Sequence, residues 1–188
     1  MKSIVIFASG NGSNAQRIIE HFHAGDLASV DLVLSNKARA QVLERATRLG
    51  VAAVSFNKKA INNGHIKALL DKINPDLIVL AGYLWLFPED ILKAHNNKVI
   101  NIHPALLPDY GGKGMYGMHV HDAVIAQGEK KSGITIHYVT PEYDKGSIIF
   151  QAETAIDATD TPETLAGKIH ALEHEHFPKV LEKLLTAE

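Results

Sequence analysis

The stretch Val99-Ile-Asn-Ile-His-Pro-Ala-Leu-Leu-Pro-Asp-Tyr110 organises the chain. It begins as an apolar strand and ends as a loop that Pro104 and Pro108 stiffen, because proline fixes its own φ and restricts the residue before it. Asn101 and His103 are two residues apart, so on an extended backbone they project from the same face. A carboxamide donor beside a titratable imidazole suits a reaction that builds negative charge on a carbonyl oxygen. The ordinary alternative is a histidine at a strand end that bonds only to backbone.

Length and composition place the chain among single-domain globular proteins. Its 188 residues, 46% of them hydrophobic and 21% charged, suffice for a full core, and we expect one domain over residues 1–188. The net charge of -2 gives no reason to expect nucleic acid as a partner. The absence of cysteine excludes disulfides, thiolate metal sites and cysteine nucleophiles. No apolar run approaches the roughly 20 residues of a membrane span, and the first residues resemble a strand rather than a signal peptide, so the expected location is the cytoplasm.

A glycine-rich turn follows the first expected strand, Ile4–Ala8. The turn reads Ser-Gly-Asn-Gly-Ser-Asn over 9–14, and a helical pattern begins directly after it. Glycines let the backbone approach a ligand closely, and the free N–H groups of a helix N-terminus favour a phosphate. The spacing matches neither the dinucleotide GxGxxG motif nor a Walker loop. It therefore favours a monophosphate, with a plain tight turn as the alternative.

Apolar runs and helical patterns alternate along the rest of the chain and predict an α/β fold with a doubly wound, mainly parallel sheet. Further strands are expected at Val30–Leu34, Val51–Phe56 and Asp76–Ala81, and helices at Ala38–Leu49, His65–Lys72, Glu89–His95 and Met118–Gln127. The strands Ser132–Val139 and Ser147–Thr154 are joined by so short a loop that they can pair only antiparallel. A long amphipathic helix follows Pro162, and Pro178 should kink it.

The loop Gly82-Tyr-Leu-Trp-Leu-Phe-Pro88 leaves the carboxyl end of a central strand, where open α/β sheets bind ligands. Its apolar and aromatic residues could line a pocket for a flat heterocycle. They could equally pack a helix onto the core, and the sequence leaves both interpretations open.

Histidines are numerous, but their spacing argues against a metal site. The pairs His119/His121 and His174/His176 fall on expected helices, where residues two apart diverge. His170 and His174 have the helical spacing of four, yet only Glu173 accompanies them, and it points elsewhere. We therefore expect no metal.

Taken together, these motifs resemble one family, the phosphoribosylglycinamide formyltransferases that use 10-formyltetrahydrofolate in the third step of purine synthesis. The resemblance spans nearly the whole chain. It rests on the turn at 9–14, Ser35–Lys37 (SNK), Leu80–Tyr83 (LAGY), Asn101–Pro108 (NIHPALLP) and His137–Ile149 (HYVTPEYDKGSII), with Glu173-His174 typical of the ribonucleotide-specific branch.

The resemblance implies roles by position. Asn101, His103 and Asp144 match the family's catalytic residues, Asp144 being expected to orient His103 and favour its charged form. The residues implied for the ribonucleotide are Gly12, Ser13, Asn14, His170, Ala171, Leu172 and Glu173. Those implied for the folate co-substrate are Lys59, Leu84, Trp85, Leu86, Phe87, Thr140, Pro141, Glu142, Tyr143 and Asp144. The partners implied are these small molecules, without nucleic acid or membrane, and possibly a second copy of the chain.

One segment departs from the family pattern. Between Asp109 and His119 the family commonly has a shorter linker of the Tyr-Pro-Gly kind, whereas here Gly111-Gly-Lys-Gly-Met-Tyr-Gly117 is longer and rich in glycine. Three other functions remain alternatives: a formyltetrahydrofolate hydrolase with the same polar residues, a non-catalytic folate- or nucleotide-binding module and, less favoured, a nicotinamide dehydrogenase without its fingerprint.

Overall fold

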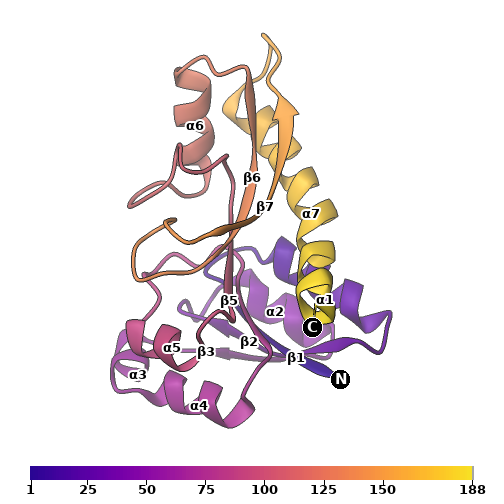
Figure 1. Cartoon of the computed structure of the whole chain (residues 1–188), viewed down its shortest axis with the longest axis vertical. Helices are drawn as coiled ribbons and strands as arrows, with labels where there is room; N and C mark the ends of the chain where they lie inside the picture. Colours follow the sequence, from indigo (N-terminus) through magenta and orange to yellow (C-terminus); the bar gives the residue numbers. More distant parts are fainter. Residues whose placement is uncertain (188) are drawn as a thin grey trace.

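The computed structural model describes residues 1–187, and in it a seven-stranded sheet runs through the molecule in the order β3-β2-β1-β4-β5-β6-β7 (Figure 1). The strands are β1 (Lys2–Phe7), β2 (Ala28–Ser35), β3 (Ala52–Ser55), β4 (Leu77–Leu80), β5 (Val99–His103), β6 (Lys131–Tyr138) and β7 (Ile148–Ala155). The helices are α1 (Ser13–His23), α2 (Gln41–Arg48), α3 (Lys58–Asn62), α4 (His65–Ile73), α5 (Glu89–Ala94), α6 (Met118–Ala126) and α7 (Pro162–Thr186).

The pairing of the strands confirms the predicted fold class. The five strands from β3 to β5 are parallel, and β6 and β7 extend the sheet antiparallel. The order of connection reverses between β1 and β4, so their carboxyl ends and that of β5 meet at a topological switch point, where open α/β sheets bind ligands. In the antiparallel pair, Asn101 lies opposite His137, and His103 lies opposite Thr135.

Two apolar cores, one on each face of the sheet, hold the helices in place. The larger one packs α1, α2, α6 and α7 on one face, and the smaller one packs α3, α4 and α5 on the other. Figure 1 shows the long α7 crossing beside α1 near the C-terminus, away from α3, α4 and α5. Central strands are covered on both sides, which is why their sequences are continuous apolar runs rather than alternating ones.

Local details differ from the sequence expectations in two places. The second helix begins at Gln41 rather than Ala38, because residues 37–40 form a turn closed by the Ala40 N–H on the Lys37 carbonyl. The short α3 was not predicted, although Asn57 caps it by accepting from the Ala60 N–H at 2.9 Å. The α7 helix runs through Pro178 as one element. Among the helices described, none is both long and apolar enough to cross a membrane.

Candidate active site

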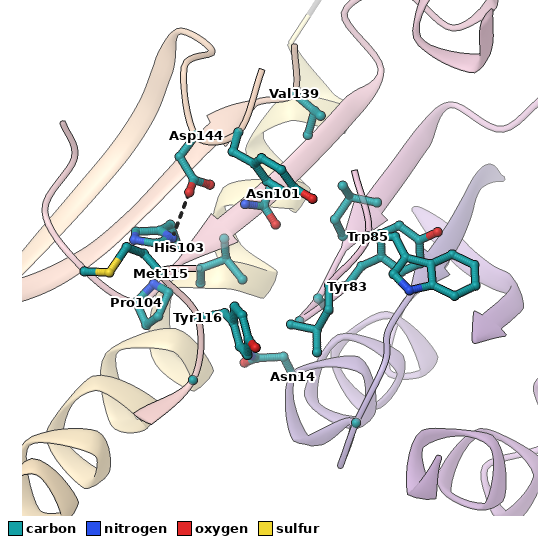
Figure 2. Close-up of a pocket in the computed structure, with 18 of the residues that line it drawn as sticks. Asn14, Tyr83, Trp85, Asn101, His103, Pro104, Met115, Tyr116, Val139 and Asp144 are labelled. Carbon is teal, nitrogen blue, oxygen red and sulfur yellow. Dashed lines mark ion pairs between the residues drawn. The ribbon is translucent and has the colours of Figure 1, made fainter. Parts of the chain in front are cut away.

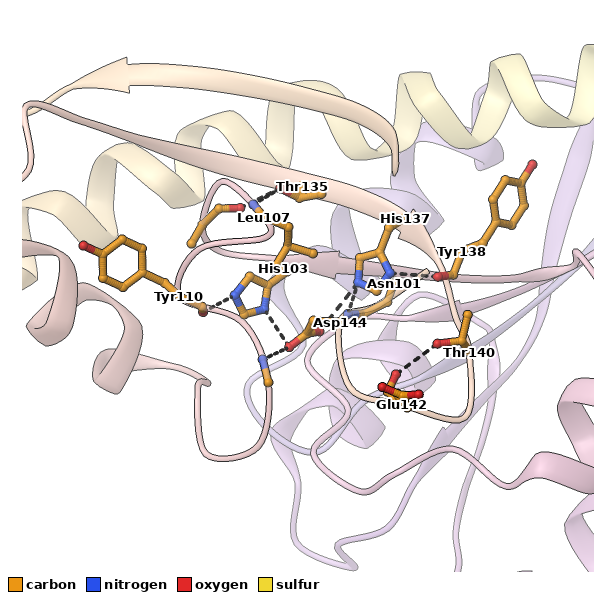
Figure 3. Close-up of polar contacts among 12 residues, drawn as sticks. Asn101, His103, Leu107, Tyr110, Thr135, His137, Tyr138, Thr140, Glu142 and Asp144 are labelled. Atoms are coloured by element: carbon orange, nitrogen blue, oxygen red, sulfur yellow. Dashed lines mark hydrogen bonds and ion pairs between the residues drawn. The ribbon is translucent and has the colours of Figure 1, made fainter. Parts of the chain in front are cut away.

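The residues singled out at the centre of the chain meet at the carboxyl end of β5. The buried His103 ring places Nδ1 3.6 Å from Oδ2 of Asp144, and its Nε2 lies 2.7 Å from the backbone oxygen of Tyr110 (Figure 3). A carbonyl can only accept, so Nε2 carries a proton and neutral His103 has a bare Nδ1 facing the carboxylate. Because 3.6 Å is too long for a direct hydrogen bond, the interaction with Asp144 is electrostatic.

Burial and charge act in opposite directions on the imidazole. Burial lowers the pKa of His103 below its ordinary value, while the charge of Asp144 and the Tyr110 carbonyl raise it without fully offsetting burial. Asp144 therefore favours the charged ring, as expected, but in the free protein the balance lies with neutral His103. The pKa of Asp144 is lowered: burial opposes this, but the interactions with the His137 and His103 rings and the hydrogen bond from the Gly112 N–H outweigh burial.

Asn101 is oriented by a second histidine, His137 on β6, to which the sequence motifs assign no role. His137 donates through Nδ1 to the Tyr138 backbone oxygen at 2.8 Å, so its Nε2 can accept from Nδ2 of Asn101 at 3.0 Å. The same Nε2 lies 3.6 Å from Oδ1 of Asp144. One N–H of the Asn101 amide is thereby used to fix the side chain, and the other is left for a ligand. The alternation along β6, which puts His137 on the same face as Thr135, was the available signal.

The loop after β5 holds the dyad of His103 and Asp144 through its backbone. The Tyr110 carbonyl accepts from His103, and the Gly112 N–H donates to Oδ2 of Asp144 at 2.8 Å. Between them, Gly111 has no room for a side chain: a Cβ there would lie 2.6 Å from Cδ2 of Leu107 and 3.2 Å from Cβ of Asp144. The sequence pattern could not reveal this arrangement, because backbone groups are common to every residue.

Thr135 fixes the first part of the same loop. Its hydroxyl donates to the Ala105 carbonyl at 2.7 Å and accepts from the Leu107 N–H at 2.9 Å. Gln151 on β7 donates to the Leu107 carbonyl at 3.0 Å and to the Thr135 hydroxyl at 2.9 Å. The antiparallel extension of the sheet is therefore what positions the loop that in turn holds His103.

A cleft of about 560 Å³ opens beside these residues, and the glycine-rich turn after β1 forms one end of it (Figure 2). Gly12, at φ +81°, is the N-cap of α1, and Ser13 and Asn14 form the first turn of that helix. The Nδ2 of Asn14 donates to Oε2 of Glu173 on α7 at 2.9 Å. Burial raises the pKa of Glu173, and the hydrogen bond from Asn14 opposes this. His170 also lines the cleft, so this end combines free backbone N–H groups with polar side chains.

The loop after β4 forms the apolar end of the cleft. Tyr83 and Phe87 pack into the core against Phe7, with ring centroids 5.5 and 5.2 Å away, while Leu84 and Leu86 remain exposed. The loop thus packs onto the core and also presents apolar surface to the cleft. Ser9 joins the two ends, since its hydroxyl accepts from the Leu84 N–H at 3.0 Å. The opposite wall comes from the loop after β6, where the lining residues are Val139, Thr140, Glu142, Tyr143 and Asp144.

Four of the residues assigned by position do not line the cleft within residues 1–187. Ala171 and Leu172 point elsewhere because on a helix only residues three or four apart, here His170 and Glu173, share a face. Pro141 lines a separate hollow behind the loop after β6. Lys59 lies on α3, and it is the neighbouring Lys58 that reaches the rim, with its ammonium 5.6 Å from the Trp85 ring.

The polar residues of the cleft are not arranged as a metal centre. In the part of the chain that the structure describes, no three histidine, aspartate or glutamate side chains come together in a way that could hold a metal ion. The groups in the cleft that can act on a substrate include the Asn101 amide, the His103 imidazole and the Asp144 carboxylate.

Known proteins resemble this chain over nearly its whole length. The model of the formyl transferase family matches residues 2–181. The Bacillus subtilis phosphoribosylglycinamide formyltransferase is 38% identical, over 98% of this chain and 95% of its own length. The chloroplastic phosphoribosylglycinamide formyltransferase of Vigna unguiculata is 39% identical over 97% of this chain, which spans only 61% of the plant protein.

Solved structures give the same result. The crystal structure of glycinamide ribonucleotide transformylase 1 from Geobacillus kaustophilus superposes with a TM-score of 0.90 at 37% identity. The match covers 98% of this chain and 99% of the other. The family model covers nearly the whole chain, and relatives are more than 30% identical over nearly its full length: this chain belongs to the formyl transferase family.

Proposed function

We propose that the protein transfers the formyl group of 10-formyltetrahydrofolate to the amine of 5'-phosphoribosylglycinamide. The observation that carries the proposal is the cleft with two unlike ends that meet at Asn101, His103 and Asp144. One end offers N–H groups and a helix N-terminus for a phosphate, and the other offers apolar surface for a flat ring. A reaction between an anionic and a heterocyclic substrate fits this division.

The ribonucleotide is assigned to the end formed by Gly12, Ser13 and Asn14. The first turn of α1 supplies N–H groups for the phosphate. His170 and Glu173, on the cleft-facing side of α7, are suited to contact the ribose. The Asn14–Glu173 hydrogen bond joins the two elements, so both can act on one ligand.

The pterin of the folate is assigned to the apolar end. Leu84 and Leu86 offer exposed apolar surface there, and the loop Thr140–Asp144 forms the facing wall. Lys58, held over Trp85 at the rim, is better placed than Lys59 to meet a carboxylate of the folate tail. This assignment puts the formyl group near the middle of the cleft, beside Asn101 and His103.

The residues support a direct transfer. The amine nitrogen attacks the formyl carbon, and the electrons of the C=O bond move to the oxygen, which accepts the free N–H of Asn101. Neutral His103 takes the proton that the attacking nitrogen releases at Nδ1, and the charge of Asp144 stabilises the imidazolium. The electrons on the oxygen then re-form the C=O bond while the bond between the formyl carbon and the folate nitrogen breaks. His103 gives its proton to that nitrogen, so the ring ends neutral.

A hydrolase would use the same polar residues with water as the attacking group. The ribonucleotide end, in which Asn14 and Glu173 are joined across α1 and α7, favours the transferase. The test is to mix the protein with a 10-formylfolate and follow the folate absorbance with and without the ribonucleotide. We expect deformylation only when the ribonucleotide is present. Equal rates in both mixtures would indicate a hydrolase, and no reaction in either would indicate a binding module.

We propose in addition that the chain acts as one domain, that it works in the cytoplasm, and that it can form a homodimer. These proposals follow the composition and the family. Sedimentation of the purified protein at several concentrations tests the last of them, and a single monomer mass throughout would refute it.

A further inference from the structure

The glycine-rich segment Gly111–Gly117, which departs from the family pattern, is part of the cleft. Six of its seven residues, from Gly112 to Gly117, line the same cavity as the turn after β1. Figure 2 shows Tyr116 on the same side of this cavity as Asn14, across from Val139 and Asp144. The segment is anchored at its start by the Gly112–Asp144 hydrogen bond and ends at α6. It therefore forms a wall of the proposed ribonucleotide end.

Lys113 stands at the tip of this wall. The Met115 N–H donates to the Gly112 carbonyl at 3.1 Å and closes a four-residue turn with Lys113 and Gly114 at its centre. Gly114, at φ +91°, supplies the positive φ that such a turn needs at its third position. The lysine is exposed, and within residues 1–187 no ion pair engages its ammonium. It is free to reach a ligand on a flexible four-carbon stem.

The charged side chains that line the cleft make Lys113 important for binding an anion. Among the described residues that line the cavity, Lys113 is the only lysine or arginine, whereas Glu142, Asp144 and Glu173 bring three carboxyl groups. Arg45 lies behind the glycine-rich turn, where Nε donates to the Asn11 carbonyl at 2.9 Å, and it does not line the cavity. His170 also lines the cavity, from the cleft-facing side of α7.

We propose that Lys113 is the specificity-determining cation for the phosphate of the substrate, and that it closes over the end of the cleft formed by the first turn of α1. The inference rests on the proposed function, since it takes the ribonucleotide as the phosphate ester that binds there. A phosphate carries up to two negative charges, and a cleft with three carboxyl groups and no fixed cation would repel it. The N–H groups of the turn set its position, and the lysine supplies the charge.

The test uses the full chain with Lys113→Met, which removes the charge and keeps the length, and Lys113→Arg, which keeps the charge. The matched control is Lys130→Met, because Lys130 is likewise exposed but lies outside the cleft. KM and kcat are measured for the ribonucleotide, for its dephosphorylated riboside and for the formylfolate. Binding of ribose 5-phosphate is measured separately by calorimetry, so that the result does not depend on turnover.

We expect Lys113→Met to raise the KM for the ribonucleotide and the Kd for ribose 5-phosphate at least about tenfold, the size of a lost charge-assisted hydrogen bond. The riboside and folate constants should stay within about twofold, and arginine should restore most of the loss. Equal losses with ribonucleotide and riboside, or a loss confined to the folate, would overturn the proposal. If wild type binds ribose 5-phosphate through Lys113 but transfers no formyl group, the proposed function fails and the phosphate site stands.

Discussion

Replacing Asp144 with asparagine keeps the shape of the side chain and an acceptor for the Gly112 N–H, but removes a charge from the centre of the cleft. The carboxylate is largely buried, with its side chain 11% exposed, and lies 3.6 Å from His103. In the proposed mechanism this charge matters most when His103 holds the proton from the attacking amine. The substitution should therefore impair turnover more than binding.

The size of the effect follows from the distance. Two unit charges 3.6 Å apart attract by about 1 kcal/mol in bulk water and by about 5 kcal/mol at an effective dielectric constant of 20. A mostly buried pair lies between these limits, and half of the larger value corresponds to a loss of about a hundredfold in kcat. The KM values of both substrates should change by less than about threefold, because the lost interaction acts in the transition state.

Two measurements check this prediction. Steady-state kinetics give kcat and KM for wild type and Asp144→Asn, and an NMR titration of the His103 ring gives its pKa in both proteins. The direction of the pKa change follows from the charge. The Asp144 carboxylate raises the pKa of His103 against the effect of burial, so removing that charge must lower the pKa further. An unchanged titration together with normal turnover would show that Asp144 is a turn residue without a catalytic role.

Changes at Asn101, at Gly111 and in the pH should each have a distinct effect. Asn101→Ala should lower kcat by roughly a hundred- to a thousandfold, as the loss of an oxyanion donor usually does, while the circular dichroism spectrum stays near normal. A loss in kcat below about tenfold would contradict that role. Gly111→Ala should lower both kcat and the unfolding midpoint, because the added Cβ would meet Leu107 and Asp144. The control is Gly167→Ala at an exposed position of α7, where an added Cβ would meet nothing within 4 Å, and it should preserve kcat. In urea titrations, the free energy of unfolding should fall as the pH drops below 6.5. Burial lowers the pKa of four histidines in the folded protein, so the unfolded chain binds more protons in this range; they are His95, His103, His121 and His174. The raised pKa of Glu173 acts in the opposite direction, but it is one group against four. A urea midpoint that is unchanged or higher at about pH 5.5 would refute the prediction.

Much of the sheet could be predicted from the sequence because its central strands are continuous apolar runs bounded by glycine, proline and polar turns. The same logic placed Asn101 and His103 together, since a spacing of two on a strand allows only one relative orientation. Asp144 is different. Nothing in its own surroundings distinguishes it from a turn residue, and only the family resemblance placed it beside His103.

The parts that escaped prediction depend on tertiary contacts or on the backbone. The Tyr110 carbonyl and the Gly112 N–H hold the dyad, but every residue has such groups, so no sequence pattern marks them. The resemblance implies the whole segment 170–173 for the ribonucleotide, including Ala171 and Leu172, whereas the helical period lets only its first and last residues face the cleft. Conversely, Lys113 lies in the one segment where the family pattern gave no guidance.

In the proposed mechanism, the cleft brings the two substrates together for direct transfer of the formyl carbon. Isotope labelling tests it most directly: the protein is given a folate with a carbon-13 formyl group and a ribonucleotide with nitrogen-15 in its amine, and the products are examined by NMR. The proposed mechanism predicts a new one-bond carbon–nitrogen coupling in the formylated ribonucleotide, at a rate that Asp144→Asn reduces. Labelled formate without that coupling, formed at the same rate when the ribonucleotide is omitted, would contradict it.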